Sequence, residues 1–275
     1  FLAGLAAWRV LSADQPAAAA RAGLVPMAAV GVSALVLIAI PVVLTVLLAA
    51  ESNRPSIDYI GAARGSLHPA LLLTFIAPHI FGAAGRMEDY WGPPSFAWSD
   101  TGLFIAQNMG QLYIGAVPFL LLLVAALRGA LWTREIRFFT VAALVLLAYA
   151  LGWYTPLFSL CYAVLPGVSL YRRPADATFL IGALGAILAG YGAHRLLGSG
   201  TGATLLRSRA ALLAVCTIAT AIPVAYALGM VLERMPRVHA PVLLALVSFA
   251  GGGAALVLAV LRWPARPMLA AALLA

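Results

Sequence analysis

The sequence predicts an all-α protein, a polytopic bundle of transmembrane helices with no soluble domain of any size. Of its 275 residues, 64% are hydrophobic and only 9% are charged, whereas a soluble domain carries about 25% charged residues. Long apolar runs recur along the chain, and a helix needs roughly 20 such residues to cross the hydrocarbon core of a bilayer. The basic residues lie mostly in short segments between these runs, which is the pattern of membrane proteins.

Six of the apolar runs are predicted to be complete spans. The first, 24–50, is uncharged; Pro26 lies in its first turn, and Pro41 is expected to kink it. The others are 112–127, 138–154, 178–193, 210–232 and 241–261. The run 69–85 is apolar but short, and Pro78 and His79 interrupt it, so we expect a re-entrant or interfacial helix there.

The whole chain, 1–275, is expected to be a single transmembrane helical domain. Residues 1–11 are typical of a helix already under way, and residues 268–275 of the start of another. We therefore expect a fragment truncated at both ends. Two long loops, about 51–111 and 152–177, connect the predicted spans and are rich in Tyr, Trp and Pro.

The distribution of Arg predicts which side these loops face. The short loops around Ser12, Thr133, Gly200 and Pro264 together hold ten Arg and two acids, whereas the long loops and the one near Arg237 hold seven of each. Cytoplasmic loops carry the excess of basic residues. The two long loops are therefore predicted to lie outside, and we look for function there because loops on a rigid scaffold carry function.

Several chemistries are excluded from this segment. Lys is absent, so neither a Walker A phosphate loop nor a Schiff-base site can be present. Cys161 and Cys216 are the only cysteines, too few for a disulfide framework or a metal site. No metal-ligand spacing, nucleophile elbow or HExxH motif occurs, so no metal and no cofactor is predicted. The dispersed Arg residues do not indicate nucleic-acid binding.

Charged residues at the ends of spans are the best candidates for function. Arg172 and Arg173 directly precede a span, with Asp176 close by. Such a pair can hold a phosphate through the planar guanidinium groups, or it can reach to lipid headgroups. Glu51 and Arg54 follow a span. That carboxylate could act as a base or orient a sugar hydroxyl, and the alternative is an ordinary helix-end charge.

Two residues of the first outer loop are further candidates. His79 could move a proton or donate to a hydroxyl, although a lone His is more often a structural hydrogen-bonding group. Tyr90 lies in the stretch MEDYWG. The aromatic residues of this loop could equally form a belt at the level of the lipid headgroups.

Four stretches give the chain a resemblance to a known family. They are ESNRPS with a following Tyr and GSL, PHIFG with YWG, Tyr113-Ile114-Gly115, and YTPLFSLCYAVLPGVSLYRRPADATFLIGALGAILAGYG. In this order they resemble the YfhO family of bacterial multi-pass membrane proteins, which is similar to the GT-C class of glycosyltransferases. The resemblance covers about 24–192 and implies a GT-C-like bundle in the bacterial inner (cytoplasmic) membrane. The absence of Lys and the abundance of Ala agree with a bacterial origin.

The resemblance implies a glycosyltransferase that passes a sugar from a polyprenyl-phosphate carrier to an acceptor in the cell envelope, with membrane lipid around it. Arg172 and Arg173 would hold the carrier phosphate. Glu51, Arg54, His79 and Tyr90 would shape the acceptor side. GT-C enzymes keep a key acidic residue in the first outer loop after the first span, so the catalytic acid is expected upstream of Phe1.

Two other functions remain open at this point. The first is a transporter or flippase for a lipid-linked sugar, and the second is a non-catalytic subunit of a membrane assembly. Ion-coupled transporters usually show paired repeats and charges at mid-membrane, and neither is visible here. The sequence upstream of Phe1 would separate an enzyme from an assembly subunit.

Overall fold

The computed structural model of the chain describes residues 2–51, 57–78, 80–83, 86–95, 97–98, 101–165, 167–170, 172–198, 243 and 247–255. Within these ranges the regular elements are all helical and no strand occurs, which confirms the predicted all-α class. The chain divides into two compact units, Phe1–Ile57 and Asp58–Ala275.

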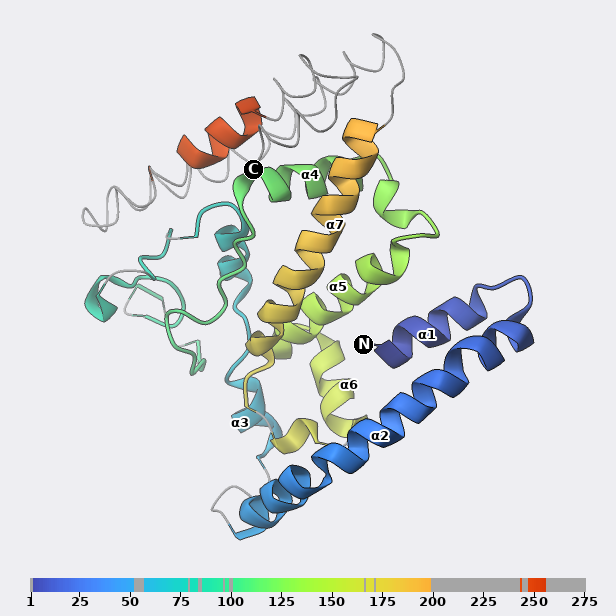
Figure 1. Cartoon of the computed structure of the whole chain (residues 1–275). Coiled ribbons are helices and arrows are strands. Elements are labelled where there is room, and N and C mark those ends of the chain that lie inside the picture. The colour runs from blue at the N-terminus through green and yellow to red at the C-terminus, as the bar shows by residue number, and fades with distance from the viewer. Residues whose placement is uncertain are drawn as a thin grey trace. The chain divides into compact units, whose positions relative to one another are not determined.

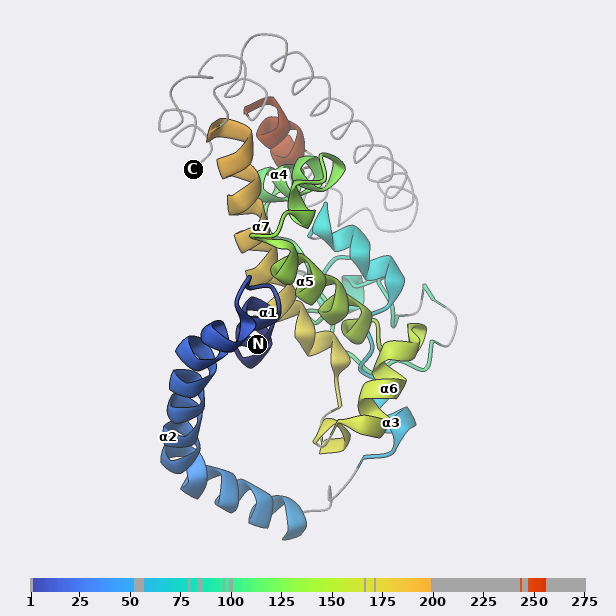
Figure 2. The ribbon, with the colours of Figure 1, turned by 90° about the vertical axis from the view of Figure 1, so that its right-hand side faces the viewer.

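The first unit contains α1 (Leu2–Leu11) and α2 (Pro16–Glu51), which pack against each other (Figure 1). α2 contains the predicted span 24–50, continues through both internal prolines and curves along its length (Figure 2). It is about 54 Å long at 1.5 Å per residue, more than the ~30 Å thickness of the hydrocarbon core. Apart from the half-buried Met27, the large apolar side chains that the structure describes on α2 are exposed. The Ser33 hydroxyl donates to the carbonyl of Ala29 (2.9 Å), so it needs no water inside a bilayer.

The second unit is organised around α7 (Thr178–Gly198), which packs against α4 (Ala116–Leu127) and α5 (Arg137–Ala150) (Figures 1 and 2). The approach of α7 to α4 is close at Gly192, where a β-carbon would lie 2.9 Å from the carbonyl oxygen of Leu121. The shorter elements of this unit are α3 (Tyr59–Ala63), η1 (Pro69–Phe75), η2 (Met87–Asp89), η3 (Ala130–Trp132), η4 (Gly152–Tyr154), α6 (Pro156–Val164), η5 (Val168–Leu170) and η6 (Pro174–Ala177).

Two of the predicted spans form helices that are shorter than expected. α4 begins only after Gly115, whose φ of +102° is not helical, and α5 ends before Gly152, whose φ is +57°. The two helices are about 18 and 21 Å long. Among the described residues, two helical stretches, Pro16–Leu44 and Pro174–Arg195, are long and apolar enough to cross a membrane by length and composition.

The remaining predicted elements are partly visible. In the run 69–85 the structure has the 3₁₀ helix η1, whose seven residues extend about 14 Å and are too short to cross. The predicted span 210–232 lies outside the described residues. Of 241–261, the structure describes 243 and 247–255, which are helical. Phe249 in that segment is buried, and its ring lies 6.1 Å from that of Phe119 in α4.

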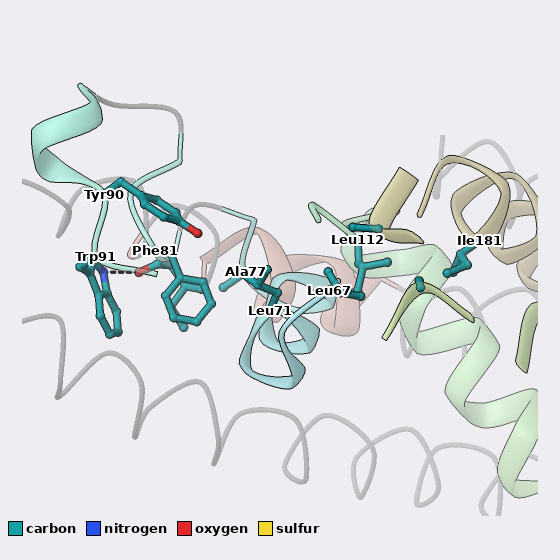
Figure 3. Packing of buried hydrophobic residues seen from close by; sticks show 11 residues of the cluster. Leu67, Leu71, Ala77, Phe81, Tyr90, Trp91, Leu112 and Ile181 are labelled. Atoms are coloured by element: carbon teal, nitrogen blue, oxygen red, sulfur yellow. Dashed lines mark hydrogen bonds between the residues drawn. The ribbon is translucent and has the colours of Figure 1, made fainter. Parts of the chain in front are cut away.

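The largest described cluster of buried apolar side chains joins the loop between α3 and α4 to the start of α7 (Figure 3). Leu67 and Leu71 lie in the loop, and Ile181 lies on α7. At the far end of the cluster, the ring of Trp91 lies 4.9 Å from that of Phe81, and its indole nitrogen donates to the carbonyl of Ile80 (2.8 Å). These contacts fix the loop against the helices and so hold the backbone of the site described below.

His68 links this cluster to the aromatic residues around it. Its Nδ1 accepts from the amide of Ala70 (3.1 Å), and its ring lies 5.0 Å from Trp98 and 5.3 Å from Tyr154. Burial lowers the pKa of the His68 imidazole below its ordinary value. Protonation would also turn the accepting Nδ1 into a donor.

We therefore expect the second unit to lose stability in acid. Because the pKa of His68 is lower in the folded chain than in the unfolded one, the unfolded chain binds the proton first. The free energy of unfolding should fall as pH drops below the ordinary histidine pKa of about 6.5. His68→Gln, which keeps an acceptor, should remove part of this dependence when unfolding is followed between about pH 5 and 7.5. An identical pH dependence in both proteins would show that another group is responsible.

Candidate functional site

The turn Arg64–Leu67 after α3 holds the backbone of the site. The carbonyl of Gly65 accepts from the amide of Ala175 (3.1 Å), and the carbonyl of Arg64 accepts from the amide of Phe104 (2.7 Å). At Gly65 a β-carbon would lie 2.5 Å from Cα of Arg173. Glycine is therefore needed there, because real β-carbons do not approach backbone atoms so closely. The turn places the backbone of Arg173.

Ser66 in the same turn fastens the loop that follows α5. Its hydroxyl donates to the carbonyl of Ala63 and accepts from the amide of Trp153 (3.0 Å), while the amide of Leu67 donates to the carbonyl of Ala150 (2.8 Å). Ser66 is fully buried. A β-carbon at Gly152 would overlap the Ser66 hydroxyl. The turn therefore packs directly against the backbone after α5.

A pocket of about 820 Å³ opens beside this turn. Three segments line it: 106–111, the stretch from Arg173 to Asp176, and the first turns of α7 from Thr178 to Ala183. Thr74 of η1 connects to the end of the first segment. Its hydroxyl donates to the carbonyl of Leu71 (2.6 Å) and accepts from the amide of Leu112 (3.1 Å). The pocket thus has two charged side chains at one end and apolar helix at the other.

Arg173 is the main candidate in the pocket. Its guanidinium Nη1 donates to the thioether sulfur of Met109 (3.3 Å), its one hydrogen-bond partner among the described residues. A thioether is a weak acceptor and a guanidinium has five N–H groups, so Met109 occupies only a small part of its donor capacity. Arg173 also lies at the positive end of the α7 dipole, where anions are stabilised. This arrangement fits an anionic ligand.

Two further polar side chains shape the same pocket. Asp176 lines it and is exposed. Gln111 lines it too, and both polar atoms of its carboxamide are buried without a hydrogen-bond partner in the described part of the chain. A buried amide in that state is rare in native structures. A ligand in the pocket that reached this amide would satisfy it.

Comparison of the chain with family models, curated proteins and solved structures found no match.

The structure brings together only some of the residues that the sequence pointed to. Arg173 and Asp176 line one pocket, whereas Arg172 is exposed beside it and is not among the lining residues. Glu51 is exposed at the end of α2, in the first unit. Arg54 and His79 lie outside the described residues. In the described ranges no group of three His, Cys, Asp or Glu side chains could hold a metal ion.

Tyr90 lies in the buried cluster rather than in the pocket. It is 5% exposed, and its hydroxyl donates to the carbonyl of Pro93 (3.0 Å). Burial raises the pKa of this hydroxyl well above its ordinary value, so it stays protonated. In the described structure Tyr90 supports the fold of the loop between α3 and α4.

Sequence reasoning did not point to Met109 and Gln111 as parts of the site. Both lie in an irregular stretch with no periodicity or motif, so no local signal marked them. Gly65 and Ser66 stood only in the quoted GSL stretch of the resemblance. Their role comes from contacts with residues about 90 to 110 positions later, which no local pattern reveals.

Proposed function

We propose that the chain is part of a multi-pass protein of the bacterial cytoplasmic membrane that binds a polyprenyl-phosphate-linked sugar and serves sugar transfer to an acceptor in the cell envelope. The observation that carries this proposal is the Arg173 guanidinium, which lies at a pocket and whose one hydrogen-bond partner in the described part of the chain is a thioether. The apolar helices α2 and α7, long enough to span a bilayer, support the membrane setting.

In the proposed reaction a hydroxyl of the acceptor attacks the anomeric carbon of the sugar. The bond between that carbon and the carrier phosphate oxygen breaks, and the carrier phosphate leaves with the electron pair. Negative charge grows on the leaving phosphate, and Arg173 would stabilise it through paired N–H donors. The proton of the acceptor hydroxyl passes to a carboxylate that acts as the base.

Asp176 and Gln111 fit the sugar part of such a ligand. A carboxylate accepts hydrogen bonds from hydroxyls, and a carboxamide both accepts and donates them. Both residues line the pocket that Arg173 borders. A site built to hydrogen-bond a hydroxyl rejects analogues that lack it, because its own polar groups are then left unpaired. The sugar end of the ligand would therefore lie toward these two side chains.

The variant Arg173→Gln tests whether ligand binding depends on this side chain or on a general attraction between basic residues and anionic lipid. The affinity of the full-length protein in lipid nanodiscs for a polyprenyl-phosphate sugar should fall at least about tenfold, since a charge-assisted hydrogen bond contributes roughly 1.5–3 kcal/mol. Transfer of a radiolabelled sugar should fall with it. Arg172→Gln is the matched control. It removes the same charge from the neighbouring residue, whose side chain does not line the pocket.

The pair of variants gives clear alternatives. Equal losses in both would indicate a general attraction of basic side chains to anionic lipid and would contradict a specific phosphate site at Arg173. If the full-length protein binds the ligand through Arg173 but transfers no sugar, the proposed transferase activity is contradicted. A transporter or flippase of lipid-linked sugars is then favoured.

A further inference from the structure

The two faces of α7 differ in what covers them. Ile181, Leu184 and Leu188 are buried on the side that packs in the core of the unit. The residues on the other side of the helix are exposed: Phe179, Leu180, Ala183, Ala186, Ile187 and Gly190. All of these exposed residues are apolar, and from Thr178 to Ala193 the helix carries no charge.

This exposed face begins inside the pocket. Phe179, Gly182 and Ala183 line the pocket, and Phe179 is 84% exposed. At Gly182 and at Gly190 an added β-carbon would meet no atom within 4 Å. The small residues therefore leave a shallow, open surface that continues without interruption from the charged end of the pocket along α7. From Phe179 to Gly190 it extends about 17 Å.

We propose that the pocket and this face of α7 form one site for an amphiphile, with its phosphate at Arg173 and its isoprenoid tail along the surface from Phe179 to Gly190. The inference rests on the proposed carrier site and adds the path of the tail. Charge complementarity fixes the direction, because the cation and Asp176 lie at one end and the rest of the face is apolar. Small residues on a helix allow close approach of a neighbouring chain, which here is the hydrocarbon tail.

The path can be tested by filling it without disturbing the fold. Gly190→Leu and Gly182→Leu add a side chain where nothing lies within 4 Å, and Leu is a better helix former than Gly. Gly31→Leu in α2 is the matched control, since it is also an exposed helical glycine with nothing within 4 Å. Binding is measured on the full-length protein in detergent micelles with three probes: a long polyprenyl phosphate, a two-isoprene phosphate and phosphatidic acid.

We expect the wild type to bind the long phosphate at least about tenfold more tightly than the short one, a difference of roughly 1.4 kcal/mol. Gly190→Leu should remove most of that difference while leaving the short phosphate unaffected. Gly182→Leu adds its side chain inside the pocket and should weaken both phosphates, and Gly31→Leu should bind all probes as the wild type does. Arg173→Gln should weaken the long and short phosphates alike.

The outcomes separate the tail path from the proposed function. If Arg173→Gln weakens both phosphates but chain length and Gly190→Leu have no effect, the tail path is overturned and the phosphate site stands. If Arg173→Gln has no effect on either phosphate, the carrier site itself fails. If phosphatidic acid binds as tightly as the long phosphate and loses the same affinity in Gly190→Leu, the tail is an acyl chain and the isoprenoid assignment is overturned.

Discussion

Replacing Gly152→Ala should destabilise the second unit by about 3 kcal/mol or more. Two effects act together at this position. The φ of +57° favours glycine, and the new methyl group would overlap the buried Ser66 hydroxyl that holds the amide of Trp153. Thermal unfolding of the full-length protein in detergent micelles measures the loss.

Gly129→Ala separates the two effects. Gly129 has a similar φ of +69°, but nothing lies within 4 Å of an added β-carbon. Its substitution should cost only the conformational strain, about 1 kcal/mol. Adding Ser66→Gly to Gly152→Ala removes the overlapping hydroxyl and should recover part of the stability. Equal losses for Gly152→Ala and Gly129→Ala would mean that the contact with Ser66 is unimportant.

Replacing Gly65→Ala should weaken ligand binding more than it weakens the fold. The methyl group would lie 2.5 Å from Cα of Arg173 and 3.0 Å from the carbonyl oxygen of Arg172. Those backbone atoms must move away, and the guanidinium moves with them. Because a shift of about 1 Å at a charged contact can cost up to a hundredfold in function, the affinity for polyprenyl phosphate should fall at least about tenfold.

Affinity and unfolding are measured together on Gly65→Ala, with binding expressed per folded molecule. Gly251→Ala is the control, a helical glycine with nothing within 4 Å of an added β-carbon. Wild-type affinity in a folded Gly65→Ala protein would show that Arg173 does not depend on this turn. A loss confined to affinity, with little change in the unfolding temperature, is the result we expect.

The class of fold and most of the α-helices could be predicted from the sequence, because composition and the length of apolar runs are properties of continuous stretches of chain. The predicted run 24–50 lies within α2, which ends one residue after the predicted end but begins eight residues before the predicted start, at Pro16. Helix ends were harder to predict, since α4 begins only after Gly115 and α5 ends before Gly152, and both glycines have a positive φ. An apolar residue such as Leu112 belongs to a run by composition but lies in the buried cluster before the helix starts.

The candidate site was predictable only in part, for a related reason. Arg173 and Asp176 stood out because charge before an apolar run is unusual. Met109 and Gln111 carry no such signal, and their place beside Arg173 is set by contacts across more than 60 residues of chain. The sequence alone does not show which of the adjacent residues Arg172 and Arg173 faces the pocket. The close packing of Gly65 against Arg173 and the lining of the pocket distinguish them.

The turn at Arg64–Leu67 also has a consequence for the order in which the protein is made. Its partners at Ala150, Trp153 and Ala175 are synthesised roughly 85 to 110 residues later. Until they leave the ribosome, the carbonyl of Gly65 and the hydroxyl of Ser66 lack their native partners. The pocket is therefore among the last features of this region to form during synthesis, and a nascent chain that stops before α7 contains the turn but cannot hold a ligand.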